Sequence, residues 1–382
     1  MNKKIKICMV VYAYYPWDES RVQREAIALT KMGHTVDVIC LRKNNEPITG
    51  NENGVTFYRL PMRRHYSKKI LVQLTDYCFF GVLVFLRLLR KGCNYKIIHF
   101  HTPPDMLILA GIVPKLCGKK IILDIHDLQP ELYTAKVSKG LIVDVLTISE
   151  KLSCRFANNV ITVTDIWRNR LIKRGVPAQK CDVIMNLPDE KVFYLRPKQK
   201  DDFYNIVYHG TLVKRYGVDV IIKAIPIVKT AIPEIKLHII GDGEELNNLI
   251  SLASKLDIAD KVYFSKKFVT VDELPDILSK MSTGIVPNRA DCFTKEVLNT
   301  KLLEYAAMNI PIIASSTIGI RTYFDKDSIL FFTPGNEKEL AEKIISLYNN
   351  PNKAKELAAN AEKIFKKHNW RAESQKLRKY CR

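Results

Sequence analysis

The chain has 382 residues, enough for two domains, and its 47% hydrophobic and 26% charged residues exclude disordered and fibrous proteins. Its 60 Lys and Arg against 40 Asp and Glu give a net charge of +20, so we expect an anionic partner: nucleic acid, an anionic membrane face or phosphorylated substrates. The nine cysteines are widely spaced and include no Cys-x-x-Cys pair, which disfavours a disulfide framework or a zinc site and favours a reducing cytosol.

Short apolar runs alternate with longer helical patterns in the first half of the chain. A helix is expected to begin at Ser20, with Gln23 at the capping-box spacing, and to end at Gly33 and His34. Strands separated by helices indicate βαβ units and a parallel sheet. The expected strands are Lys6–Tyr12, Thr35–Leu41, Val55–Arg59, Ile97–His101, Ile121–Ile125 and Val160–Val163.

One apolar stretch, Ile70–Leu89, is long enough to span a membrane. Gln73, Asp76 and Arg87 interrupt it, and a central Asp costs about 2.5–3.5 kcal/mol in a spanning helix. Two interpretations remain: a buried or half-buried helix of the first domain, or a helix that lies on a membrane surface. Residues 61–96 contain eight Lys and Arg and one acidic residue, which favours attraction to an anionic leaflet.

A second alternating series follows a linker, Asn186–Asp202, that is rich in Pro and Lys. The two series, about 190 residues each, predict an α/β protein with two doubly wound Rossmann-like domains that face a central cleft. We expect an N-terminal domain at 1–188, a C-terminal domain at 189–365 and a terminal helix at 366–382 that packs back on the N-terminal domain. The expected strands are Tyr204–His209, Lys236–Gly241, Val262–Phe264, Gly284–Val286 and Pro311–Ala314, and the expected helices are Gly217–Thr230, Glu244–Leu256, Asp272–Met281 and Leu298–Met308.

The stretch Gly284–Ser315 carries the strongest signal for a binding site. Ligands of an open parallel sheet bind beyond the carboxyl ends of its strands, where helix N-termini direct free N–H groups at anions. Asn299 and Thr300 open the helix of this stretch, so we expect them to hold a phosphate, with charge added by Lys301. Glu304 lies beyond the first turn, where its carboxylate could accept hydrogen bonds from vicinal hydroxyls.

Glu296 and Glu304 form a Glu-x7-Glu pair, and the sequence LLEYAAMNIPIIAS includes the second of them. This combination resembles the signature of retaining glycosyltransferase family 4, the glycosyl transferases of group 1, which have the GT-B fold. The resemblance extends over nearly the whole chain. The other segments that are similar to family motifs are 97–101, 124–131, 183–189, 208–217 and 239–245.

The resemblance implies a role for particular residues of this chain. The implied catalytic residues are Arg215, Glu296 and His126, with Arg215 holding the donor diphosphate. The implied donor-binding residues are Glu304, Lys301, Asn299, Thr300, Lys295, Gly210, Gly241 and Gly243. The implied acceptor-side residues are Asp127, His101 and Arg21.

The chain departs from the family pattern at three places. The first loop has Asp18–Arg21 where the family has Gly-Gly, so the charge of Arg21 is expected to substitute there. Val297–Asn299 replaces Gly-Phe-Gly. Thr211 stands at a position where an Arg is frequent, so Lys214 or Lys295 is expected to supply that phosphate contact.

The implied reaction moves a hexosyl unit from a nucleoside-diphosphate sugar to a glycan or polyprenyl-linked acceptor, in surface polysaccharide or glycolipid synthesis. We expect no metal or other cofactor, with cationic side chains and helix N–H groups stabilising the leaving diphosphate. In this family, retention of the anomeric configuration is thought to result from attack by the acceptor on the same face of the sugar that the leaving group occupies. The departing phosphate then takes the acceptor's proton. We expect a cytoplasmic protein, peripheral on the inner face of the cell membrane.

Two other classes of function stay open at this stage. One is a GT-B sugar-nucleotide epimerase, which needs no acceptor. The other is a basic protein that binds nucleic acid or a dinucleotide. The second class is disfavoured because Gly241 and Gly243 lack the third glycine of the dinucleotide fingerprint, and because no basic patch is interleaved with aromatic residues. We therefore expect no nucleic-acid partner.

Overall fold

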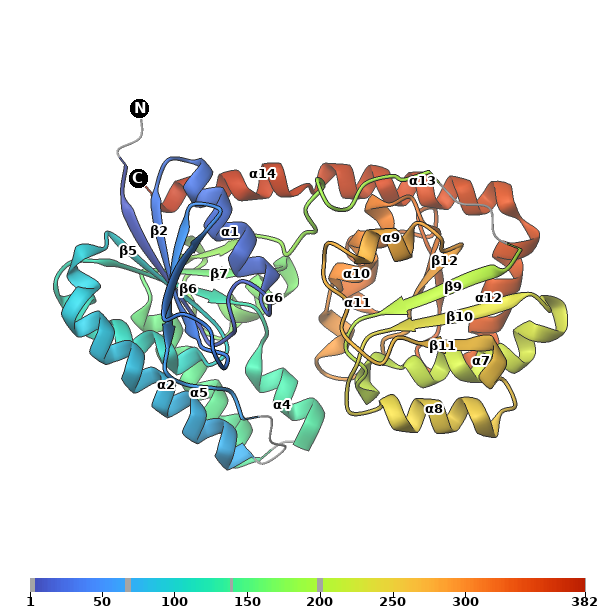
Figure 1. The fold of residues 1–382 in the computed structure, drawn as a ribbon, viewed down its shortest axis with the longest axis horizontal. Coiled ribbons are helices and arrows are strands. Elements are labelled where there is room, and N and C mark those ends of the chain that lie inside the picture. The colour runs from blue at the N-terminus through green and yellow to red at the C-terminus, as the bar shows by residue number, and fades with distance from the viewer. Residues whose placement is uncertain (1–3, 66–69, 138–139, 198–201, 382) are drawn as a thin grey trace. The chain divides into compact units, whose positions relative to one another are not determined.

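The computed structural model describes residues 4–65, 70–137, 140–197 and 202–381. The chain forms two compact units (Figure 1). The N-terminal unit consists of Met1–Asn186 together with Arg371–Arg382, and the C-terminal unit consists of Leu187–Trp370. The chain therefore passes between the units twice, once within the expected linker and once near its C-terminal end.

The N-terminal unit is built on an eight-stranded sheet in the order β3-β4-β2-β1-β5-β6-β7-β8. Every neighbouring pair is parallel except β3 and β4. The central strands are apolar and buried along nearly their whole length, as expected for a parallel sheet that is covered on both faces. The strands are β1 (Lys6–Val11), β2 (Thr35–Leu41), β3 (Thr49–Glu52), β4 (Val55–Leu60), β5 (Ile97–His101), β6 (Lys120–Ile125), β7 (Asn159–Thr162) and β8 (Cys181–Val183).

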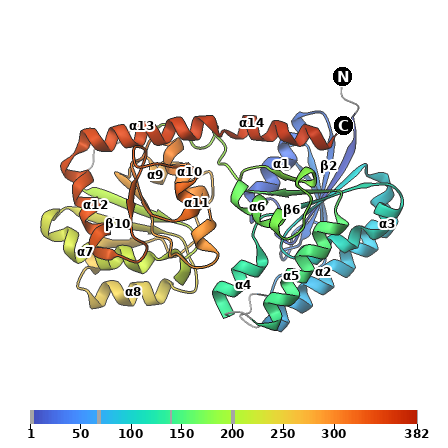
Figure 2. The same cartoon turned by 180° about the vertical axis from the view of Figure 1, so that it is seen from behind.

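Helices connect these strands, and α2 and α5 run beside each other in both views (Figures 1 and 2). Both helices pack against the short 3-10 helix Asp105–Gly111. Phe80, Val84 and Leu88 of α2 are buried, so the apolar stretch of the sequence is a half-buried helix of this unit. The α-helices are α1 (Ser20–Lys31), α2 (Ile70–Lys91), α3 (Ile112–Leu116), α4 (Gln129–Val137), α5 (Leu141–Phe156) and α6 (Asp165–Lys173).

The C-terminal unit has a six-stranded parallel sheet in the order β11-β10-β9-β12-β13-β14. Its core is formed largely by aliphatic side chains of β9, β10 and α7, and α7 also packs against α8 and α12. The strands are β9 (Tyr204–His209), β10 (Ile235–Ile240), β11 (Val262–Phe264), β12 (Thr283–Val286), β13 (Ile312–Ser315) and β14 (Leu330–Phe332). The helices are α7 (Val218–Ala231), α8 (Leu246–Lys255), α9 (Leu274–Leu278), α10 (Thr300–Ala307), α11 (Ile318–Arg321), α12 (Glu337–Asn349) and α13 (Pro351–Lys367).

The C-terminal segment returns to the N-terminal unit through α14 (Trp370–Gln375) and the 3-10 helix Lys376–Tyr380. Glu373 accepts a hydrogen bond from the Met185 amide at 2.9 Å, and the Tyr380 hydroxyl donates to Asp182 at 2.8 Å. Tyr380 is also buried. The segment that belongs to the N-terminal unit begins at residue 371, later than the expected 366, because α13 still packs within the C-terminal unit.

Several local expectations are corrected by the structure. Ser20 is not a helix cap: it is the first residue of α1, the cap position is Glu19, and no side chain caps the helix there. The expected helix Asp272–Met281 is reduced to α9, whose cap residue Glu273 accepts hydrogen bonds from Thr270. The strands β3, β8 and β14 were not expected.

Candidate functional site

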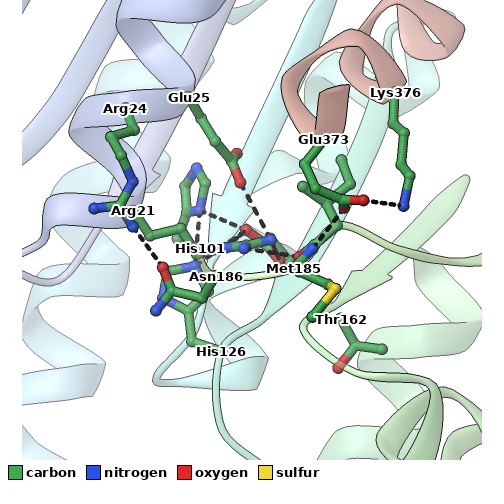
Figure 3. Close-up of polar contacts among 12 residues, drawn as sticks. Arg21, Arg24, Glu25, His101, His126, Thr162, Met185, Asn186, Glu373 and Lys376 are labelled. Atoms are coloured by element: carbon green, nitrogen blue, oxygen red, sulfur yellow. Dashed lines mark hydrogen bonds and ion pairs between the residues drawn. The ribbon is translucent and has the colours of Figure 1, made fainter. Parts of the chain in front are cut away.

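A buried cluster of charged and imidazole side chains lies at the carboxyl ends of β5 and β6 (Figure 3). His101 is the last residue of β5, and the parallel register places it opposite Asp124 of β6. Arg21 and Glu25 enter the cluster from the first turns of α1. His126 follows β6 directly. Adjacent parallel strands thus bring residues from distant parts of the sequence to one edge of the sheet.

Asp124 is the centre of this cluster. Its Oδ2 lies 2.8 Å from Arg21 Nε, 3.1 Å from His126 Nε2 and 3.2 Å from His101 Nδ1. Its Oδ1 accepts a second hydrogen bond from Arg21, from Nη2 at 3.0 Å. A bidentate pair of this kind fixes both groups in orientation as well as in charge.

The guanidinium of Arg21 is fully engaged inside the protein and is not available to a substrate. Its side chain is 1% exposed, and besides Asp124 it contacts Glu25 at 3.2 Å and the carbonyl oxygen of Ile184 at 2.9 Å. We expected Arg21 to replace the missing glycines of the first loop by its charge. The structure instead places it inside the unit, where it balances two buried carboxylates.

Burial and the fixed charges determine how these groups titrate. Burial by itself would raise the pKa of Asp124, but Arg21 and the two imidazoles hold that pKa well below its ordinary range. Burial lowers the pKa of His101 to about 4, so this ring is neutral near pH 7. For His126, burial is outweighed by the Asp124 carboxylate, and its pKa is raised.

Ligand-type atoms of Glu25, His99, His101 and Asp124 lie within 4.8 Å of one another, the grouping a metal ion uses. The Arg21 guanidinium already lies against both carboxylates of this group. Because a divalent cation there would be repelled by that guanidinium, the arrangement fits an ion-pair network better than a metal centre.

A second group of candidate residues lies in the C-terminal unit, where the loops after β9, β10 and β12 meet the start of α10. Asn299 occupies the cap position of α10 and Thr300 is its first residue, so the amides that were expected to bind phosphate do open a helix. Asn288, which follows β12, donates a hydrogen bond to the side chain of Asn299 at 2.5 Å. That contact fixes the N-terminus of the helix.

Glu304 lies in the second turn of α10, next to His209 at the end of β9. Their atoms Oε2 and Nε2 are 3.1 Å apart, at ion-pair distance without hydrogen-bond geometry. Burial, assisted by the charge of Lys301, lowers the pKa of His209 well below its usual value. His209 is therefore neutral near pH 7. It is a site residue that the sequence analysis missed, although its place at the end of a strand was a signal.

Lys301 is nearly buried, with Nζ 3.9 Å from the centre of the Tyr208 ring and 5.0 Å from that of Tyr216. Burial lowers its pKa to about 7, a shift that Glu304 opposes. Gly210, at a φ of +119°, leaves room for it: a Cβ there would lie 3.1 Å from Lys301 Nζ.

Arg215 lies in the 3-10 helix Lys214–Tyr216, above the ring of Phe293 at 5.9 Å. Its Nη1 is buried and has no hydrogen-bond acceptor among the described residues. A buried guanidinium nitrogen without an acceptor is costly, so it is suited to an anionic ligand oxygen. Gly217 is the cap residue of α7, and its left-handed φ of +65° lets the chain pass close to Pro287.

Gly241 and Gly243 allow two loops to approach each other. A Cβ on Gly241 would collide with the carbonyl oxygen of Gly210, and one on Gly243 would collide with that of Leu212. These glycines therefore have a packing role that does not depend on a ligand.

Glu296 is buried in the 3-10 helix Thr294–Glu296, and Lys295 precedes it. Gly319 of α11 packs against the backbone of Glu296 so closely that a Cβ would not fit. Asp127, on the other unit, is half-buried between β6 and α4. The structure thus places the residues expected on the acceptor side in one unit and those expected to bind the donor in the other.

Comparisons with known proteins agree with this architecture. Residues 194–364 match the family model for glycosyl transferases group 1, and residues 19–191 match the model for glycosyltransferase family 4. A phosphatidylinositol N-acetylglucosaminyltransferase gpi3 subunit from Schizosaccharomyces pombe is 25% identical over 338 residues, 86% of this chain and 69% of that protein. A GDP-mannose-dependent phosphatidylinositol monomannoside mannosyltransferase from Mycolicibacterium smegmatis is 30% identical over 235 residues, 59% of this chain and 60% of that protein.

Solved structures of low sequence identity share the fold. Sucrose-phosphate synthase from Thermosynechococcus elongatus superposes with a TM-score of 0.80 at 18% identity, covering 99% of this chain and 98% of that one. Anabaena HepE in complex with UDP-glucose superposes with a TM-score of 0.75 at 16% identity, covering 98% and 99%. With two parallel-sheet units and both family models matched in sequence order, the chain belongs to glycosyltransferase family 4 (glycosyl transferases group 1) and is a glycosyltransferase with the GT-B fold.

Proposed function

We propose that this glycosyltransferase is a retaining hexosyltransferase that uses a nucleoside-diphosphate sugar. The observation that carries the proposal is the buried Nη1 of Arg215, which has no hydrogen-bond partner in the described part of the chain and lies in the same unit as the N-terminus of α10. A leaving diphosphate supplies the acceptor oxygens that Arg215 lacks. Glu304 then holds the donor's hydroxyl groups, and Glu296 and Lys295 complete the donor site.

The names of the relatives support this class of donor. HepE was solved with UDP-glucose, and the mannosyltransferase is named for GDP-mannose. The donor site of this chain offers cationic side chains and helix amides, so we propose that the reaction needs no metal or other cofactor.

We further propose a lipid-linked glycan acceptor and a position on the inner face of the cell membrane, in the cytoplasm. Two of the relatives are named for phosphatidylinositol-based acceptors, and a third is an O-antigen glycosyltransferase from Escherichia coli. Among the described residues, one helix, Val72–Asn94, is long and apolar enough to cross a membrane by length and composition alone. Its buried face belongs to the N-terminal unit, which favours a surface contact over a spanning one.

The exposed side of that unit carries three apolar stripes on neighbouring elements. Each stripe follows helical spacing, so its side chains share a face. The exposed residues are Phe79, Val82, Leu86 and Leu89 of α2, Met106, Leu109, Ile112 and Leu116 of the 3-10 helix Asp105–Gly111 and α3, and Leu141, Val145, Ile148 and Leu152 of α5. Arg90, Lys91, Lys151 and Arg155 are exposed on the same two helices and suit anionic headgroups.

The experiment combines ligand protection with turnover. UDP-glucose, UDP-N-acetylglucosamine and GDP-mannose are added separately to the purified protein, and a true donor should raise the melting temperature by mass action. Arg215→Met and Glu304→Gln should weaken that protection and lower turnover more than tenfold, because one charged hydrogen bond contributes about 1.5–3 kcal/mol. Lys255→Met, which removes one exposed charge from the same unit, is the matched control.

Three outcomes would contradict the proposal. Wild-type turnover in both variants at subsaturating donor would remove the assigned donor site. Consumption of the donor in the absence of any acceptor, with an epimerised sugar as product, would favour the epimerase. An absolute requirement for Mg²⁺ or Mn²⁺ after EDTA treatment would overturn the role of the cationic side chains.

A further inference from the structure

The carboxylate of Asp124 holds two imidazoles on one oxygen. His126 Nε2 lies 3.1 Å from Oδ2, His101 Nδ1 lies 3.2 Å from it, and the two nitrogens are 3.1 Å apart. An ionised carboxylate only accepts hydrogen bonds, so the Nε2 of His126 that is hydrogen-bonded to it carries the N–H. Asp124 and His101 are fully buried, whereas the His126 side chain is 11% exposed.

This arrangement decides which nitrogen of His126 is open. With Nε2 directed at Asp124, only Nδ1 is left for another partner. Its nearest charged neighbour is Oε1 of Glu19, at 3.7 Å, beyond hydrogen-bond distance, on a side chain that is 32% exposed. The other charged and titratable groups around the ring are Arg21 and Glu25 of α1 and His99 and His101 of β5.

Arg21 keeps Asp124 in place. Its two nitrogens hold both carboxylate oxygens, and its third donates to the Ile184 carbonyl at 2.9 Å, so the guanidinium cannot rotate away. His101 is neutral and lies behind His126, with an Nε2 that is buried and has no hydrogen-bond partner in the described part of the chain. The Thr102 hydroxyl accepts a hydrogen bond from the His126 amide at 3.2 Å, which fixes the backbone as well.

We propose that Asp124, clamped by Arg21, is a positioning residue for glycosyl transfer: it holds His126 by Nε2, so that Nδ1 is the nitrogen offered to the substrate. The proposal rests on the transfer activity proposed above. When His126 is neutral, Nδ1 accepts a hydrogen bond from a substrate hydroxyl. When His126 is protonated, Nδ1 donates to an anionic oxygen. Asp124 and Arg21, which touch no substrate in this proposal, thus determine which nitrogen of His126 acts.

The first test needs no variant of Asp124 and no substrate. Nuclear magnetic resonance of protein with ¹⁵N-labelled histidine reports which ring nitrogen carries the proton, and the His126→Asn variant assigns the signal. We expect the Nε2–H form at high pH, and a pKa above that of a free histidine. A neutral His126 protonated on Nδ1 would overturn the proposal.

The second test separates positioning from packing. Arg21→Lys keeps the charge but loses the bidentate grip, and Asp124→Asn keeps the shape but loses the charge. Asp124→Asn should lower the pKa of His126, because it removes the carboxylate that raises that pKa, and should shift the acidic limb of the kcat/KM profile in parallel. Arg21→Lys should change the tautomer or the chemical shifts of the His126 ring, and both variants should reduce kcat at least tenfold. Arg24→Lys is the control, because Arg24 lies on the same helix and donates to Asn186 at 2.6 Å.

The outcomes distinguish the possible roles. If Asp124→Asn and Arg21→Lys fold but leave the pKa and tautomer of His126 unchanged, Asp124 is only structural. If Arg24→Lys moves the His126 signals as much as Arg21→Lys does, the effect is a general loss of packing and the proposal fails. If no sugar nucleotide is turned over but His126 titrates as expected, the proposed function fails while the positioning geometry stands.

Discussion

Glu25 is a carboxyl group with an unusual environment. It is fully buried on α1, and neither of its oxygens has a hydrogen bond of good geometry among the described residues. Burial raises its pKa to about 7, with Arg21 acting in the opposite direction. The folded state therefore holds a proton on Glu25 at pH values where an unfolded chain has released it.

This shift predicts a specific pH dependence. Because the folded pKa lies above the unfolded value of 4.5, the stabilisation from Glu25 is complete below pH 4.5 and is lost as the pH rises through about 7. Glu25→Gln should remove that loss, so its stability relative to wild type should improve from pH 5 to pH 8. Hydrogen exchange of the β6 amides measures this difference in stability locally. A constant difference between the two proteins across this range would contradict the assigned protonation.

Gly210 and Gly241 predict a graded effect on stability. Both have φ angles in the region that L-residues rarely adopt, so alanine strains either position. A Cβ at Gly210 meets the flexible end of Lys301, whereas one at Gly241 meets backbone. We expect Gly210→Ala to cost about 1–2 kcal/mol and Gly241→Ala to cost more, measured by urea unfolding. Equal losses would show that φ strain, and not the contact, decides the cost.

At the scale of elements, α2 and α5 supply the proposed membrane surface. Arg87 of α2, one of the eight cations counted in residues 61–96, stacks on the ring of Tyr58 at 3.9 Å and so does not face lipid. Two more of these eight cations, Lys68 and Lys69, lie outside the described residues. The contribution of α5 could not be anticipated from charge, because only its folded position places its apolar stripe beside that of α2.

Vesicle co-sedimentation tests this surface. The protein should bind anionic liposomes, and the binding should weaken with salt because attraction to headgroups is screened. Val82→Glu in α2 and Ile148→Glu in α5 should each weaken binding severalfold. Each substitution replaces an exposed apolar side chain by a carboxylate, which the anionic headgroups repel. Ile227→Glu, exposed on α7 of the other unit, is the control. A wild-type protein that stays in the supernatant at low salt would favour a soluble acceptor.

At the scale of the whole molecule, the last residues of the chain complete the N-terminal unit. Leu377 and Tyr380 are buried there, and Lys379 pairs with Asp182 at 2.7 Å. Removal of residues 371–382 should therefore destabilise the N-terminal unit selectively. We expect faster proteolysis and faster hydrogen exchange in β7 and β8, with the C-terminal unit unchanged. Loss of protection in both units, or in neither, would contradict this assignment.

Much of the architecture could be predicted from the sequence. Apolar runs at strand length and amphipathic runs at helix length are local patterns, so the βαβ order, the parallel sheets and the helix that opens at Thr300 were all visible. The antiparallel β3 was missed although Asn53 and Gly54, with φ angles of 51° and 78°, form the turn that joins it to β4. Asn-Gly is a recognised hairpin signal, so this element was predictable in principle.

The sequence by itself determined the fold class, the family and the helix that carries Glu304, because those depend on residues that are near one another along the chain. Only the tertiary structure decided that Arg21 is buried against Asp124, that His101 and His126 share one oxygen, and that Lys301 lies over Tyr208. Such contacts join residues up to 103 positions apart. Sheet order and burial, which no local pattern records, determine both the partners of each charge and its pKa.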